Sequence, residues 1–88
     1  MILLVSYDLK GPAGSYQELI DVLKDEESWW HYMKSPWLVA TSDSPQEFFD
    51  KLKPFLRPGD HILVTQFRRP YQGWLPRKAW DWIHKHEG

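Results

Sequence analysis

The chain contains no cysteine among its 88 residues. Disulfide bridges, a thiol nucleophile and a thiolate metal site are therefore all excluded. The chain also lacks a long apolar run, since the first one reaches Asp8 after a few residues. A run that short predicts neither a secretory signal peptide nor a membrane span, so we expect a cytoplasmic protein without a membrane partner.

Net charge is also scarce, at −1 for the whole chain. Residues 1–60 hold six Lys and Arg against ten Asp and Glu, whereas residues 61–88 hold five against two. An acidic main part excludes a protein that coats nucleic acid without specificity, and the basic end is compatible with a local phosphate contact. Aromatic residues, by contrast, are plentiful, with six Trp, four Tyr and four Phe. In a chain this small they more often fill a core, and they also form interfaces and stacking surfaces.

The hydrophobic pattern predicts alternating strands and helices. We expect strands at 2–8, 28–34, 37–41 and 61–67, and helices at 15–24, 44–54 and 76–85. The first six elements give the order strand, helix, strand, strand, helix, strand. This order predicts an α+β, ferredoxin-like split βαβ fold for residues 1–67. Residues 68–88 form an extension with an extra C-terminal helix in the same domain.

Two Ser-to-Glu spacings predict where the first two helices begin. Ser15 precedes Glu18 by three residues, and Ser44 precedes Glu47 by three residues. Each pair matches a capping box, in which the serine and glutamate side chains bind free backbone N–H groups of the first helical turn. Pro54 predicts the end of the second helix.

The first strand is apolar on both faces, which is typical of a central strand. Asp8 shares its parity with Ile2 and Leu4, and helices in this fold cover only one face of the sheet. The pattern leaves two interpretations of Asp8 open: the start of a turn, or a carboxylate presented at the strand end on the open face. In the second interpretation Asp8 is more exposed than the rest of its strand and lies near a polar cavity or its symmetry mate. Something must cover the open face, whether a tail, a partner sheet or a ligand. From the two-sided first strand we expect a homodimer.

Two further sets of residues have alternative interpretations. His31 stands between aromatic residues and is either a packed side chain or a general acid or base, because its ordinary pKa suits proton transfer. A basic set near the C-terminus is either a phosphate-binding surface or the solvated rim of a docked tail. It consists of Arg68, Arg69, Arg77 and Lys78.

Several short motifs resemble the SinR-like small proteins of the CRISPR-associated protein 2 superfamily. They are Ser6-Tyr7-Asp8-Leu9, the stretch Trp29 to Tyr32 with Ser35 and Trp37 after it, the Leu52, Pro54, Leu56 element, and Asp60 before the last strand. This resemblance covers most of residues 1–67. It implies a ferredoxin-like fold, a homodimer with two sheets face to face, and Asp8 as a ligand for Mg²⁺.

The resemblance also implies a function, because some members are metal-dependent nucleases and others are structural parts of a DNA-integration complex. We therefore hypothesise a nucleic-acid-associated dimer, as a nuclease acting on RNA or DNA, with Asp8 and His31 as catalytic residues. The alternative is a non-catalytic module that dimerises through its open sheet face and binds a protein partner. The loop after Asp8 lacks the arginines common in the CRISPR-associated proteins, and the tail containing Trp74 and Trp80 differs from their short final strand. We expect the tail helix to dock on its own sheet edge or on the partner subunit.

Overall fold

The computed structural model describes residues 1–12, 14–26, 28–31 and 36–87. Within these residues, the elements in chain order are β1 (Ile2–Asp8), α1 (Gln17–Lys24), β2 (Ser28–Trp30), β3 (Trp37–Ala40), α2 (Pro45–Leu52), the 3₁₀ turn η1 (Lys53–Phe55), β4 (His61–Phe67) and α3 (Arg77–His86). The α+β class predicted from the sequence is confirmed. Pro54 lies in η1, so the predicted end of the second helix is also confirmed.

The described strands form one antiparallel sheet in the order β2-β3-β1-β4. Strand β1 is central, as its two apolar faces predict, and pairs with β4 over its full length. The hairpin of β2 and β3 is confirmed by its pairing. The structure ends β2 at Trp30, earlier than the predicted strand 28–34, and residues 32–35 lie outside the described residues.

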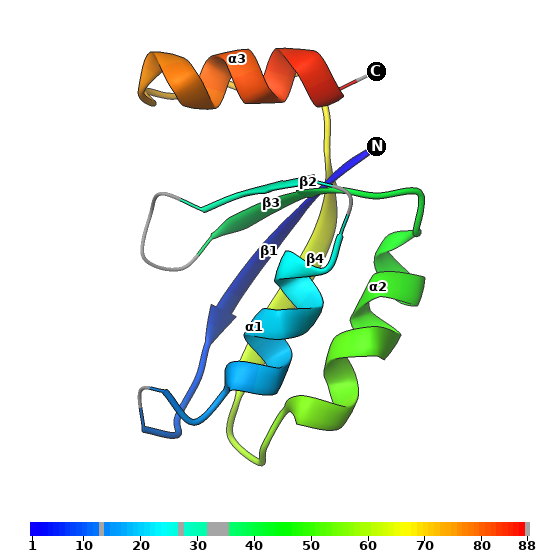
Figure 1. Cartoon of the computed structure of the whole chain (residues 1–88), viewed down its shortest axis with the longest axis vertical. Coiled ribbons are helices and arrows are strands. Elements are labelled where there is room, and N and C mark those ends of the chain that lie inside the picture. Colours follow the sequence, from blue (N-terminus) through cyan, green and yellow to red (C-terminus); the bar gives the residue numbers. More distant parts are fainter. Residues whose placement is uncertain (13, 27, 32–35, 88) are drawn as a thin grey trace.

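Helices α1 and α2 cover one face of the sheet and enclose the larger core (Figure 1). Leu3 and Val5 point to this face from β1, whereas Ile2 points to the other. The two faces therefore follow the alternation predicted for the first strand. The buried members of this core are Leu3, Val5, Tyr16, Leu19, Leu23, Trp37, Val39, Phe48 and Leu52.

The two predicted capping boxes had different outcomes. At α2 the prediction is confirmed, because the Ser44 hydroxyl accepts from the Glu47 N–H and the Glu47 carboxylate accepts from the Ser44 N–H. At α1 the prediction is wrong, because the helix begins at Gln17. Its N-cap residue is Tyr16, and no side chain caps the helix. The Ser15 hydroxyl instead donates to the Pro12 carbonyl at 2.6 Å, so it stabilises the preceding turn.

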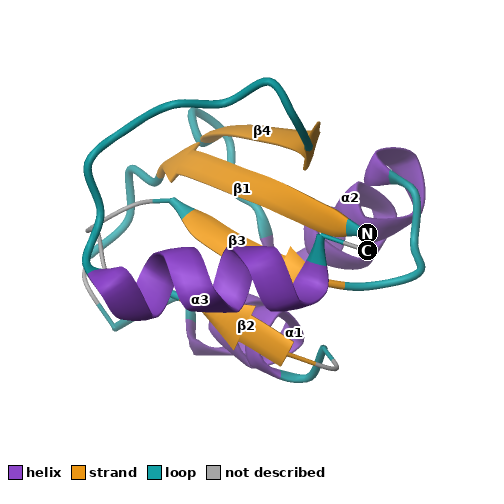
Figure 2. Cartoon of the chain, turned by 90° about the horizontal axis from the view of Figure 1, so that it is seen from above, coloured by secondary structure: helices purple, strands orange, loops and turns teal. Residues whose placement is uncertain are grey.

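Helix α3 packs on the opposite face of the sheet from α1 and α2 (Figure 1). Its buried Ile83 meets Ile2 and Leu38 in a second, smaller core. The Trp82 indole also donates to the Ser28 hydroxyl at 2.9 Å, which ties the helix to β2. The predicted tail helix is confirmed, but the prediction that it docks on the sheet edge is wrong, because its apolar side packs on the face of its own sheet over Ile2 and Leu38. In Figure 2 the chain after β4 runs round to the start of α3, which lies in front of the sheet.

Helix α3 covers only one end of this face. Ile2, at the start of β1, is buried beneath it, whereas the far end of β1 and the facing part of β4 stay exposed. Leu63 of β4 is 62% exposed, which is high for a strand leucine. We call this region, formed by Ser6, Asp8, His61 and Leu63, the open end of the sheet. Within the described residues, no helix combines the length and the apolar character needed to cross a membrane.

Candidate functional site at the open end of the sheet

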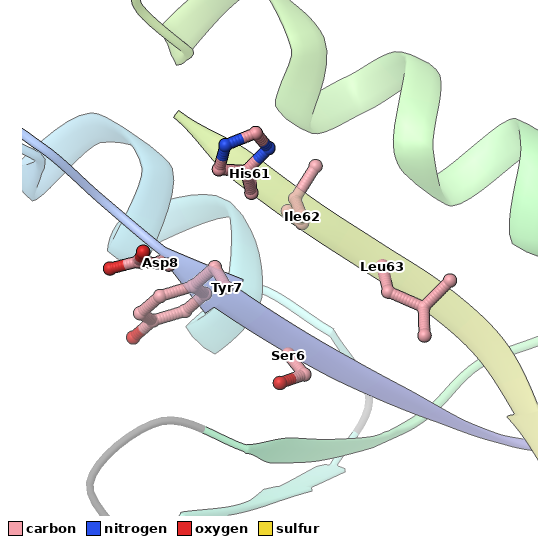
Figure 3. Close-up of a pocket in the computed structure, with 6 residues that line it drawn as sticks. All are labelled: Ser6, Tyr7, Asp8, His61, Ile62 and Leu63. Atoms are coloured by element: carbon pink, nitrogen blue, oxygen red, sulfur yellow. The ribbon is translucent and has the colours of Figure 1, made fainter. Parts of the chain in front are cut away.

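Asp8 and His61 are cross-strand neighbours at the open end. The pairing of β1 with β4 places Asp8 opposite His61 and Ser6 opposite Leu63. Side chains of directly opposed residues lie on the same face, with Cβ atoms about 5 Å apart. Figure 3 shows Asp8 and His61 at the ends of these neighbouring strands. The fold thus brings a carboxylate and an imidazole together although they lie 53 positions apart in the sequence.

The Asp8 carboxylate is accessible to solvent. Its side chain is 70% exposed, more than that of any other β1 residue, as the sequence predicted. Lys10 Nζ lies 3.5 Å from one carboxylate oxygen, and the lysine side chain is itself 60% exposed. An ion pair this exposed contributes little to stability, so another cation can replace Lys10 at the carboxylate with little loss of stability.

A shallow depression of about 290 Å³ lies at this carboxylate. Its lining comes from the last residues of β1 and the first residues of β4: Ser6, Tyr7, Asp8, His61, Ile62 and Leu63 (Figure 3). Asp8 thus lines a depression, but the depression is open and its exposed lining is more apolar than polar, so the predicted polar cavity is not confirmed. A depression so open suits a surface ligand such as a phosphodiester backbone or a second protein surface.

Asp60 fixes the loops that flank the open end. Its carboxylate accepts hydrogen bonds from the backbone N–H groups of Lys10 and Arg57, both at 2.8 Å, and from the Tyr16 hydroxyl at 2.9 Å. The hydrogen bond from the Lys10 N–H is the main cause that lowers the pKa of Asp60 below its ordinary value. The hydrogen bonds from Arg57 and Tyr16 act in the same direction. The loop packs so closely that a Cβ on Gly11 would lie 2.5 Å from the Arg57 guanidinium. Asp60 therefore joins the end of β1 to the beginning of β4.

The donor set at the open end fits Mg²⁺ only in part. Mg²⁺ is usually held by one or two carboxylates together with substrate phosphates and waters. Asp8 supplies one carboxylate, and His61 adds a nitrogen that Mg²⁺ does not favour. Among the described residues, no group of three or more His, Asp or Glu side chains could hold a metal ion. A complete site therefore needs a second Asp8, a substrate phosphate, or both.

The structure does not bring His31 to Asp8. The His31 ring stacks on Trp37 at 4.0 Å between centroids and 4° between planes, and Trp37 belongs to the core on the other face of the sheet. His31 Nδ1 lies 3.1 Å from the Pro36 carbonyl oxygen. Strand β3 also separates β2 from β1. These contacts favour the packed interpretation of His31 and offer no route for a proton to or from Asp8.

The predicted basic set is divided between the two ends of α3. Arg69 binds Glu87 near the helix C-terminus, through Nε at 3.2 Å and a terminal nitrogen at 2.9 Å. Arg77 and Lys78 are exposed in the first turn, about 15 Å away along a ten-residue helix. Arg68 is exposed at the end of β4. One phosphate group therefore cannot contact all four side chains.

A second cluster forms around Glu87 and holds the helix end in place. The Tyr71 hydroxyl donates to the other Glu87 oxygen. The hydrogen bond from Tyr71, followed in size by that from Arg69, lowers the pKa of Glu87. The hydrogen bond between Tyr71 and Glu87 also raises the pKa of Tyr71. The Tyr71 ring stacks between Phe67 and Trp80. In this cluster Arg69 acts as a structural cation, which matches the predicted rim of a docked tail.

Sequence reasoning missed His61 as a site residue. It begins a strand that the pattern did predict, directly after the Asp60 turn. The register of the strands is the signal that would have identified it. When β4 pairs antiparallel with β1, His61 stands opposite Asp8 and the two side chains lie on the same face of the sheet.

Comparison of the chain with protein-family models, with curated proteins and with solved structures finds no match in any of the three.

Proposed function

We propose that this chain is a ferredoxin-like protein related to CRISPR-associated protein 2, and that it acts on nucleic acid as a homodimer. The fold assignment is supported by the order strand, helix, strand, strand, helix, strand in residues 2–67. It is also supported by the sheet order β2-β3-β1-β4, with α1 and α2 on one face. The observation that carries the function is the exposed Asp8 carboxylate beside His61 at the end of a buried strand.

The dimer is proposed to form at the open end of the sheet. Leu63 offers apolar area there, and the polar side chains of Ser6, Thr65 and His61 surround it on the same face. In a two-fold interface the same patch meets itself, so each residue near the axis lies close to its counterpart. Asp8 near that axis is then paired with the partner subunit's Asp8.

The paired Asp8 carboxylates and a substrate phosphate form the proposed Mg²⁺ site. Bound Mg²⁺ would supply charge neutralisation on the scissile phosphate and a water with a lowered pKa. Asp8 would hold the cation, and the neighbouring His61 would accept a proton at a ring nitrogen or return one to the leaving oxygen. The reaction is hydrolysis of a phosphodiester, with RNA or DNA as substrate.

An RNA cleavage assay on the pure protein tests this proposal. We expect Mg²⁺-dependent cleavage that EDTA abolishes, that Asp8→Asn removes, and that His61→Ala reduces by about 10²- to 10⁴-fold, the usual contribution of general acid–base catalysis. The matched control is Asp25→Asn, which removes an exposed carboxylate beyond the C-terminus of α1.

Two results would contradict the proposal. One is cleavage that survives Asp8→Asn, because it would originate elsewhere or from a contaminating nuclease. The other is a light-scattering mass equal to the 10.6 kDa chain at micromolar concentration, because a monomer supplies a single Asp8.

A second candidate function is a non-catalytic interaction module. It is favoured by the exposed Leu63 and by the single carboxylate that each chain brings to the open end. This module would form the same dimer but would cleave neither RNA nor DNA with Mg²⁺ or Mn²⁺. Both functions predict a dimer, so the cleavage assay alone separates them.

A further inference from the structure

Trp74 is the most exposed large apolar side chain among the described residues. Its exposed area is 101% of the reference value, so the fold buries none of it. The residues beside it behave differently, since Tyr71 and Leu75 both pack against the second core. The short segment is thus anchored on both sides of Trp74, and only the indole projects. Packing gives no reason for a tryptophan here.

Two cations follow Trp74 within four residues. Arg77 and Lys78 are the first two residues of α3, and both are exposed. Among the described residues, neither of them forms an ion pair. Cationic side chains in a first helical turn oppose the helix dipole, and this turn contains no acidic residue to offset them. Helix stability therefore does not explain this pair of cations.

The tryptophan and the cations are exposed and lie within residues 74–78, and we call them together the Trp74 surface (Trp74, Arg77 and Lys78). Consecutive Cα atoms are 3.8 Å apart, so Arg77 starts no more than about 11 Å from Trp74 before its own side chain is counted. An indole stacks on a nucleobase, and cations at this distance reach the adjoining phosphates. Tyr71 and Arg69, an aromatic residue and a cation of the same tail, are already held by Glu87.

We propose that the Trp74 surface binds single-stranded nucleic acid, with Trp74 stacked on an unpaired base and with Arg77 and Lys78 on phosphates. This inference rests on the nucleic-acid role proposed above and adds where the strand is held. A single strand fits better than a duplex, because base faces are accessible only when unstacked. The net charge of −1 also disfavours broad backbone binding.

Fluorescence anisotropy with labelled oligouridine and oligothymidine of about 12 nucleotides tests the proposal, in EDTA to prevent cleavage. Trp74→Ala is expected to weaken binding of the single strand by about 5- to 150-fold, and Trp74→Phe by less, because a phenyl ring still stacks. The aromatic control is Trp29→Ala, at a partly exposed tryptophan on β2, accepted only if its melting curve shows a folded protein.

The cations have a separate readout in the salt dependence. Each phosphate contact to a single strand contributes about 0.7 to the slope of log K against log salt. Arg77→Ala combined with Lys78→Ala should therefore reduce that slope by about 1.4. Lys53→Ala combined with Lys85→Ala is the matched control, because it removes the same charge from exposed positions elsewhere.

Several outcomes overturn the proposal. Trp74→Ala that binds as tightly as the wild type would show that the indole does not stack on a base. Equal or tighter binding of a 12-base-pair duplex of about the same length would show backbone recognition instead. Absence of binding by the wild-type chain would leave Trp74 as a contact for a protein. Oligouridine and oligothymidine together show whether RNA or DNA is preferred. All these results are independent of cleavage at Asp8, so the two proposals can fail separately.

Discussion

The two ends of strand β1 have opposite surroundings on the same face of the sheet. Ile2, at one end, is 1% exposed under α3, and Asp8, at the other end, has a side chain 70% exposed. Both residues have the same parity on one strand, so the backbone does not account for the difference. The cause is α3, which covers the first part of the face and leaves the rest open. One end of the sheet is thus built for stability, and the other is accessible to a ligand.

The largest expected effect comes from disturbing the covered end. Ile83→Ala removes the buried side chain through which α3 meets Ile2 and Leu38, and should lower the free energy of unfolding by about 2–5 kcal/mol. In the monomer, where Leu63 is exposed, Leu63→Ala at the open end should change the free energy of unfolding by no more than about 0.5 kcal/mol. The two variants are therefore compared at a protein concentration below that at which the dimer forms. Urea denaturation of both variants measures the contrast. Equal losses of unfolding free energy would mean that the open end contributes as much to stability as the covered end.

This contrast also separates what sequence patterns predict from what they do not. Strand β4 and helix α3 follow from hydrophobic period and proline position, which are local properties of the chain. The Ser44 capping box is local too and was predicted correctly. The Ser15 box failed because the Ser15 hydroxyl bonds the Pro12 carbonyl, a competing local bond that the spacing alone does not reveal.

Non-local properties account for the rest of the differences. The proximity of His61 to Asp8 depends on strand register. The division of the basic set depends on the docking direction of α3, since Arg69 and Arg77 are eight residues apart in sequence but lie at opposite ends of the helix. His31 stacks on Trp37 only because the β2–β3 hairpin brings them together.

An intermediate loss of stability is expected in acid, where the Asp60 carboxylate that holds the loops beside the open end becomes protonated. The pKa of Asp60 is 3.8 in a model peptide and lower in the folded protein, chiefly because of the Lys10 N–H. The ionised carboxylate therefore stabilises the fold fully above pH 3.8, and this stabilisation is lost as the pH falls through the lower folded-state value. Thermal melts of the wild type should show a declining Tm in that range.

Asp60→Asn isolates this carboxylate. The variant should melt at a lower temperature than the wild type at pH 7, and its Tm should fall less steeply below pH 3.8. Asp25→Asn, at an exposed position, should follow the wild-type curve. An Asp60→Asn curve parallel to that of the wild type would mean that another group carries the acid sensitivity.

A smaller and more local effect is expected at the α3 end. Glu87 accepts hydrogen bonds from Tyr71 and Arg69, and Glu87→Gln removes the charge that strengthens them. Hydrogen exchange of the α3 amides should become faster, while the loop held by Asp60 should exchange as before. Faster exchange in both regions would show that the two ends are coupled.

The smallest effect on stability is expected from Asp8→Asn. The Asp8 side chain is exposed and its ion pair with Lys10 is open to solvent, so the Tm should not change measurably. A lowered Tm in differential scanning calorimetry would assign Asp8 a structural role. An unchanged Tm makes this variant suitable for functional comparisons.

Paramagnetic Mn²⁺, titrated into ¹⁵N-labelled protein, is the most direct test that the open end holds a divalent cation. At substoichiometric Mn²⁺, amide signals of residues 6–8 and 61–63 should broaden, and those around Ile83 in the covered end should stay sharp. In Asp8→Asn this selective broadening should disappear. Broadening that is centred elsewhere, or that persists in Asp8→Asn, would contradict the assignment of Asp8 as the metal ligand and of the open end as the functional site.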